Sequence, residues 1–190
     1  MRILEAHELT ASRDLDLARS LVASCLATEA SPTRAAVLAF LDAHTDALLR
    51  TCVPGHLTGS ALVYDTTADL FVMLHHAKLR KWLQPGGHAD GDANLAAVAL
   101  REAEEETGIA GLVVAVPAID IDIHLVAPPR ESPHLHHDVR FLVLAPSGAP
   151  VRGNHESTEL RWCSTADLDS LDVDLSVRRL VAAGRHAATR

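Results

Sequence analysis

The segment LREAEEETG, residues 100–108, constrains the fold most, because it crowds four glutamates into a stretch that ends in glycine. Like charges at helical spacing repel each other and destabilise an isolated helix. On an α-helix Glu102 lies three and four positions before Glu105 and Glu106, so these carboxylates share a side, while Glu104 points elsewhere. A solvated acidic face is one interpretation. The other is a divalent-cation site, and carboxylate oxygens suit Mg²⁺ or Mn²⁺ better than zinc.

The loop before this helix favours the cation site. PGGHADGD, residues 85–92, is rich in turn residues, and Asp92 can cap a helix that begins near Ala93 and ends at Gly108. Backbone N–H groups and the positive end of the helix dipole would then lie beside the carboxylates and offer a place for phosphate oxygens. A metal ion and amide groups would bind the same anion.

The hydrophobic period divides the chain near residues 51–55, which break a helical pattern. Before the break, two amphipathic stretches predict two helices, an N-terminal helical extension of residues 1–54. After it, alternating patterns predict strands and helical patterns predict three helices in a domain of residues 55–190. The expected strands are 56–65 and 69–76, joined as a hairpin, then 118–127, 134–145 and 159–165; the expected helices are 93–107, 166–171 and 175–188.

Composition excludes several classes of protein. The chain has 25 acidic and 17 basic residues, a formal charge of −8, and no basic run that would bind a nucleic-acid duplex. Cys25, Cys52 and Cys163 lack disulfide or zinc-knuckle spacing, which favours a reducing compartment. Since the start has no apolar signal-peptide core and no long apolar run follows, we expect a cytoplasmic protein without a membrane segment.

The loop and the acidic helix together resemble the box of the Nudix hydrolases, G-x5-E-x7-R-E-U-x-E-E-x-G-U, in which U is aliphatic. The residues that match are Gly87, Arg101, Glu102, Ala103, Glu105, Glu106, Gly108 and Ile109. The preceding WLQPGG, residues 82–87, also looks like the family's approach to the box. The resemblance covers residues from about 55 to 165 and implies an α/β fold, a Nudix-type α/β/α sandwich with a mixed sheet. One position departs from the box, because its first glutamate falls on Ala93.

The resemblance implies a pyrophosphohydrolase that depends on a divalent metal and cleaves a nucleoside diphosphate linked to another moiety. Glu102, Glu105 and Glu106 would bind Mg²⁺ or Mn²⁺, and Glu105 is preferred as the group that orients or deprotonates water. Arg101 would position the helix carboxylates through a charge-assisted bond. In the family the first box glutamate commonly supports this arginine. Because that glutamate is absent here, Arg101 would pair with Asp90, with Asp92 or with no carboxylate outside the helix.

Further site residues follow from the same resemblance. Many members take another acid from a loop after the box, and either Glu156 or Glu159 fits that catalytic role. Gly86 and Gly87 would contact substrate through their backbone. Independently of the resemblance, Arg80 lies in a small basic cluster before the loop, which is either a contact for a terminal phosphate or ordinary solvated charge. The expected partner is a small-molecule diphosphate substrate.

The twelve histidines suggest a second metal site. His134, His136 and Asp138 alternate along a strand and so share one face, and imidazole with carboxylate suits a transition ion such as Zn²⁺. This pattern is similar to the isopentenyl-diphosphate isomerases, whose two metal histidines match His56 and His88, with His136 and Asp138 in place of a Glu-x-Glu. That resemblance implies a site formed by His56, His88, His136 and Asp138.

Alternatives remain open at this level. Gly86 stands where the isomerases have a catalytic cysteine, so isomerase activity is disfavoured. The loss of the first box glutamate at Ala93 leaves room for a module that binds a nucleotide or diphosphate without catalysis. The N-terminal helices would cover the sheet, shape the substrate pocket or form a homodimer surface, and sequence does not choose between these roles.

Overall fold

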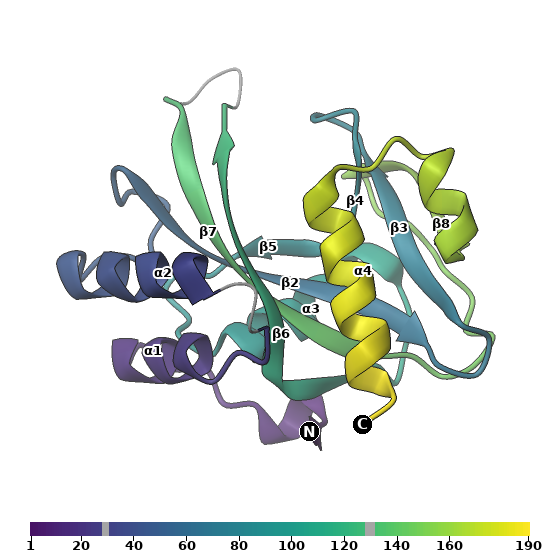
Figure 1. Cartoon of the computed structure of the whole chain (residues 1–190), viewed down its shortest axis with the longest axis horizontal. Coiled ribbons are helices and arrows are strands. Elements are labelled where there is room, and N and C mark those ends of the chain that lie inside the picture. Colours follow the sequence, from purple (N-terminus) through teal and green to yellow (C-terminus); the bar gives the residue numbers. More distant parts are fainter. Residues whose placement is uncertain (28–30, 128–131) are drawn as a thin grey trace.

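The computed structural model describes residues 1–27, 31–127 and 132–190. Its centre is an eight-stranded mixed sheet with helices on both faces (Figure 1). The strands are β1 (Arg2–Leu4), β2 (Gly55–Asp65), β3 (Leu70–His76), β4 (Trp82–Leu83), β5 (Gly86–His88), β6 (Val113–Val126), β7 (His134–Leu144) and β8 (Ser157–Cys163). The helices are α1 (Leu15–Ala23), α2 (Ser31–Ala43), α3 (Leu95–Thr107) and α4 (Leu175–Ala188), with short 3-10 helices η1 (Ala6–Glu8) and η2 (Thr165–Asp169).

The sheet is mixed because β2 and β7 run parallel, whereas the other strand pairs are antiparallel. The order is β1-β6-β7-β2-β3-β4, with β8 also paired to β3. On its other edge β2 has two successive partners. Its first half pairs with β5, where Thr58 lies opposite His88, and its end pairs with β3, where Tyr64 lies opposite Phe71. The expected hairpin is therefore confirmed, with a short antiparallel pairing.

Side chains alternate along β2 between the two helical layers. Gly59 lies so close to α3 that a Cβ there would be 2.8 Å from the carbonyl oxygen of Leu95. The even-numbered side chains of β2 face α4, since a Cβ on Gly184 of α4 would overlap the side chain of Leu62. On the α3 face, α2 is present as well, because the Phe40 ring stacks on His137 with centroids 3.9 Å apart. The predicted α/β/α sandwich with a mixed sheet is confirmed.

The N-terminal extension shares its hydrophobic core with the rest of the chain. Ala18, Val22 and Val37 from the first two helices belong to the same buried cluster as Leu57 and Val63 of β2. The two predicted helices are present, but strand β1 was not predicted, and it extends the sheet by pairing with β6. Of the roles left open for this segment, covering the sheet is therefore one that the structure shows.

Helix α3 begins slightly later than the sequence predicted. Its N-cap is Asn94, whose side chain accepts a hydrogen bond from the Ala97 N–H at 3.4 Å. Asp92 instead accepts the N–H groups of Ser12 and Asn94 at 3.0 and 2.9 Å. The helix ends as predicted at Gly108, whose φ of +63° is accessible to glycine without steric cost.

The cysteines and the helices bear on the expected reducing compartment and on the expected lack of a membrane segment. The three cysteines are buried thiols without disulfide bonds. Within the described ranges, none of the helices combines the length and apolar character needed to cross a membrane.

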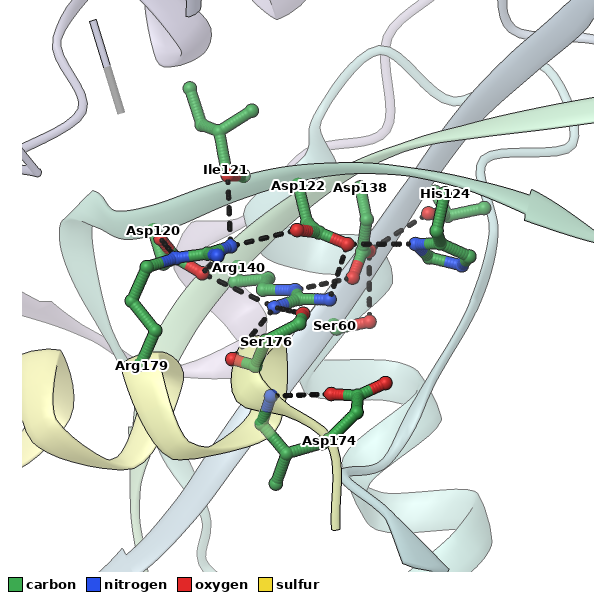
Figure 2. Close-up of polar contacts among 12 residues, drawn as sticks. Ser60, Asp120, Ile121, Asp122, His124, Asp138, Arg140, Asp174, Ser176 and Arg179 are labelled. Carbon is green, nitrogen blue, oxygen red and sulfur yellow. Dashed lines mark hydrogen bonds and ion pairs between the residues drawn. The ribbon is translucent and has the colours of Figure 1, made fainter. Parts of the chain in front are cut away.

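A buried ionic network joins the parallel strands to β6 and α4 (Figure 2). The guanidinium of Arg140 donates to Asp138 at 2.7 Å and to Asp120 at 3.2 Å, and it also donates to the Ser176 hydroxyl of α4 at 2.6 Å. Burial opposes ionisation of Asp138, but Arg140 outweighs it and holds the pKa of this carboxyl below its ordinary value. The structure thus keeps a charged pair inside the sheet.

Arg140→Met tests the energetic weight of this network. Removing the guanidinium leaves the Asp138 carboxylate buried without its charged partner, while Asp120 keeps its pair with Arg179. We therefore expect a loss of about 3–5 kcal/mol in the free energy of unfolding. Arg178→Met, which breaks an exposed pair with Asp169, is the matched control and should cost under about 1 kcal/mol. Denaturant unfolding measures both values, and equal losses would contradict a special role for Arg140.

Candidate active site

The acidic helix lines a cavity of about 440 Å³. Glu102, Glu105 and Glu106 reach it from α3, and Glu156 reaches it from the segment just before β8. The cavity lined by these four carboxylates is called the acidic cavity below. Arg101 also lines it, so the tertiary structure brings together the acids and the arginine of α3 that the sequence singled out.

Strand β5 approaches α3 closely and contacts two of these carboxylates, those of Glu102 and Glu106. A Cβ on Gly87 would overlap the carboxyl group of Glu102. The N–H of Gly86 donates to Glu106 Oε2 at 2.9 Å. The amide of Gly86 thus binds a carboxylate of the protein, and a contact between Gly86 and substrate stays a prediction. Only glycine fits at position 87, because any side chain there would collide with the Glu102 carboxyl group.

The acidic cavity holds more negative charge than its neighbours neutralise. Burial raises the pKa of Glu106 to about 8, against the effect of the Gly86 N–H and reinforced by Glu102 and Glu156. Burial also raises the pKa of Glu102, although Arg101 donates to it at 3.0 Å. A hard divalent cation fits such oxygen ligands and would relieve their repulsion.

Arg101 contacts the helix itself and not the preceding loop. Its guanidinium pairs with Glu102, which is adjacent in sequence. Asp90, one of the expected partners, instead accepts two hydrogen bonds of 2.6 Å from Arg50. Arg50 also lines the cavity, although sequence reasoning missed it. No local signal identifies this arginine, because it lies about forty positions before Asp90 and only the fold brings the two together.

The structure separates the two glutamates considered for the additional acid. Glu156 lines the acidic cavity. Glu159 lies opposite His75 in the β3–β8 ladder and pairs with Arg161 at 3.6 Å, so it is not among the residues that line the cavity. Arg80, expected to contact phosphate, is exposed beyond the end of β3 and is likewise not among them.

A scan against protein families decides the assignment: the model of the NUDIX domain matches residues 56–183. The chain belongs to the Nudix family. This confirms the resemblance seen in the sequence and places the chain among hydrolases of phosphoanhydride bonds. The matched region begins close to the predicted boundary at residue 55. A search of curated proteins found no match.

Several solved structures share this fold. An Ap4A hydrolase of C. elegans in a binary complex has a TM-score of 0.57 and 17% identity, over 70% of this chain and 97% of that one. A NUDIX-family hydrolase of Clostridium perfringens has 0.54 and 21%, over 70% and 96%. The NUDIX domain of Shewanella oneidensis NrtR, complexed with ADP ribose, has 0.52 and 16%, over 70% and 87%. At these identities the likeness concerns the fold.

Ala93, which replaces the first glutamate of the Nudix box, is fully buried beneath the N-terminal segment. Its N–H donates to the carbonyl of Ser12 at 2.6 Å, and the Ser12 N–H donates to Asp92. Next to it, the Asn94 side chain donates to the carbonyl of Thr10 at 3.1 Å. The N-terminal segment therefore packs against the chain on both sides of Ala93, and a longer side chain at this position would have to be buried.

The second predicted metal site is only partly assembled as expected. His56 lies opposite His136 in the β2–β7 ladder, and their ring centroids are 4.9 Å apart. The ring of His88 is 5.0 Å from each of them. Asp138 does not join these imidazoles, because it accepts hydrogen bonds from Thr58, Ser60 and Arg140. Its predicted role as a ligand therefore needs correction.

Another group within the described ranges has metal-ligand chemistry. His44, Asp46 and Cys52 place possible ligand atoms within 4.8 Å of one another. Burial and Asp46 raise the pKa of Cys52 to about 11. A cation would therefore have to displace the proton of this thiol in order to bind there.

Ala93→Glu tests whether the Nudix box can be restored. Ala93 is fully buried, so a glutamate there would have to bury its carboxylate, at a cost of roughly 2–7 kcal/mol unless a partner compensates it. We therefore expect a lower melting temperature and lower activity. Ala110→Glu, at an exposed position, is the control and should leave both unchanged. Higher activity at unchanged stability would show that the site can accommodate the missing glutamate.

Glu106 predicts a pH-dependent metal affinity. A pKa of about 8 means that its carboxyl is largely protonated at neutral pH and must lose this proton to bind a cation. Apparent Mn²⁺ affinity should therefore rise by up to about tenfold per pH unit below that pKa and level off above it. Calorimetric titration measures the slope, which Glu106→Gln should flatten. A pH-independent affinity in the unmodified protein would refute the assignment.

Proposed function

We propose that this protein is a divalent-metal-dependent pyrophosphohydrolase that cleaves a nucleoside diphosphate linked to another moiety. The observation that carries the proposal is the convergence of Glu102, Glu105, Glu106 and Glu156 on one cavity. Membership of the Nudix family supports the same reaction class. Two structurally similar proteins support the substrate class, since one is an Ap4A hydrolase and the other was crystallised with ADP ribose.

These four carboxylates would hold Mg²⁺ or Mn²⁺. When bound, the ion neutralises the diphosphate, polarises phosphorus and lowers the pKa of water. An acidic protein can bind a polyanion in this way. The residues fit such an ion because every proposed ligand is a hard oxygen and because the cavity has excess negative charge.

The protein's own residues would orient the reactants and accept a proton. Water attacks one phosphorus, the phosphoanhydride bond breaks, and the leaving phosphate keeps the bridging oxygen. The proton lost by water passes to a carboxylate, for which Glu105 and Glu156 are the candidates that line the cavity. Arg101 holds Glu102 in place at 3.0 Å. Arg50, at the edge of the cavity, contributes positive charge near the incoming anion.

A substrate panel tests the proposed reaction. Incubation with ADP-ribose, NADH, dinucleoside polyphosphates and oxidised nucleotides, each with Mg²⁺, Mn²⁺ or Zn²⁺, should release monophosphate or phosphate from at least one substrate. Tight binding without product would favour the non-catalytic module. The isomerase alternative conflicts with Gly86, where even a Cβ would overlap the Ser60 hydroxyl, and we expect no double-bond shift in a prenyl diphosphate.

Paired variants test which carboxylates act. Glu105→Gln, Glu106→Gln and Glu156→Gln should each lower kcat/KM by about 10²–10⁴-fold, because each removes a charged ligand or a proton acceptor. Glu159→Gln is the matched control close by in sequence and should retain activity, because Glu159 pairs with Arg161. Circular dichroism checks that all four variants fold. Loss of activity in Glu159→Gln with activity kept in Glu156→Gln would reverse the assignment.

A further inference from the structure

Five histidines gather on the face of the sheet opposite α3. His56, His88, His124, His134 and His136 come from β2, β5, β6 and β7, and neighbouring rings have centroids 4.9–5.4 Å apart. These residues are called the histidine cluster. Register explains the gathering: His136 lies opposite His56 on one side and His124 on the other, so all three share a face.

Three members of the cluster have metal-ligand geometry. His56, His134 and His136 each offer a ring nitrogen, and these nitrogens all lie within 4.8 Å of one another. Zinc–nitrogen bonds of about 2.0–2.1 Å in a tetrahedron place nitrogens about 3.4 Å apart, so small side-chain rotations suffice. Nε2 of His136 is buried and has no hydrogen-bond partner within the described chain. A buried polar atom without a hydrogen-bond partner destabilises the folded protein, and coordination of an ion by this nitrogen would offset that cost.

The neighbouring ionic network favours a cation (Figure 2). Asp120, Asp122 and Asp138 supply three carboxylates, while Arg140 and Arg179 supply two guanidinium groups, which leaves one negative charge in excess. The network also reaches the cluster directly, because His124 Nδ1 lies 3.1 Å from Asp122 Oδ2. A carboxylate behind an imidazole fixes the orientation of the ring and strengthens metal sites.

We propose that His56, His134 and His136 bind a first-row transition ion of the zinc class, with His88 or water at the fourth position. This set is not the one that the isomerase resemblance implied, because His134 takes part and Asp138 does not. The bound ion would link the start of β2 to the start of β7, where the parallel ladder begins at Gly55 and Leu135.

The histidine cluster is distinct from the acidic cavity. Gly59 of β2 faces α3, so His56, which has the opposite parity, faces the α4 side of the sheet. The ligands also differ, since imidazole nitrogen selects transition ions whereas the carboxylates of the acidic cavity select Mg²⁺. The proposed site therefore does not depend on the proposed reaction.

Cobalt(II) absorption tests this site directly. Full-length, metal-stripped protein is titrated with Co²⁺ in excess Mg²⁺, which occupies the acidic cavity. We expect one Co²⁺ per chain with the intense visible bands of a tetrahedral nitrogen site, and Zn²⁺ should displace it. The double variant His134→Gln/His136→Gln should lose these bands and at least a hundredfold in Co²⁺ affinity.

Three controls make each outcome decisive. His7→Gln/His186→Gln removes two exposed imidazoles elsewhere and should keep the bands. Glu102→Gln/Glu105→Gln should also keep them, which separates this site from the acidic cavity. Circular dichroism without metal checks that the cluster variant folds; if it does not, His134→Gln alone takes its place. Weak octahedral bands in the unmodified protein, or bands that survive removal of His134, would overturn the proposal.

Discussion

The buried guanidinium of Arg140 is the interaction on which much of this structure depends. It pairs with Asp138 inside the sheet and shares Asp120 with Arg179, at a depth where an unpaired carboxylate would cost several kcal/mol. Asp138 in turn accepts the hydroxyls of Thr58 and Ser60, so the network fixes the register of β7 against β2. A slip of one residue would move every side chain of these strands to the other face. The register is also what sets the histidine cluster on one face and α3 on the other.

The acidic cavity depends on a second constraint, the close approach of α3 to β2 and β5. Gly59 and Gly87 permit it because a side chain at either position would collide with α3 or with Glu102. The same approach buries Glu106 and raises its pKa, so the fold maintains an unfavourable cluster of carboxylates. Perturbed groups of this kind gather at functional sites, where a ligand offsets the cost.

The N-terminal segment is part of the site as well as of the core. Ser12 lies over Ala93, at the position where the Nudix box has its first glutamate, and Arg50 binds Asp90 at the edge of the cavity. The departure from the box therefore lies where the N-terminal segment packs against the start of the box helix, and the residue at this position is fully buried. Arg101 consequently pairs with Glu102, within its own helix.

Sequence alone determined what depends on local periodicity. The spacing of Glu102, Glu105 and Glu106 puts them on one side of any helix, and alternation predicts strands where β6 and β7 lie. The family and its sandwich fold followed from the resemblance of residues 87–109 to the Nudix box. Tertiary structure decided which of the candidate residues lie at each site. Glu156 and Arg50 line the cavity, whereas Glu159 and Arg80 do not. His134, and not Asp138, lies with His56 and His136. Alternation assigns a face, but strand register and packing between distant segments determine which partner meets each side chain.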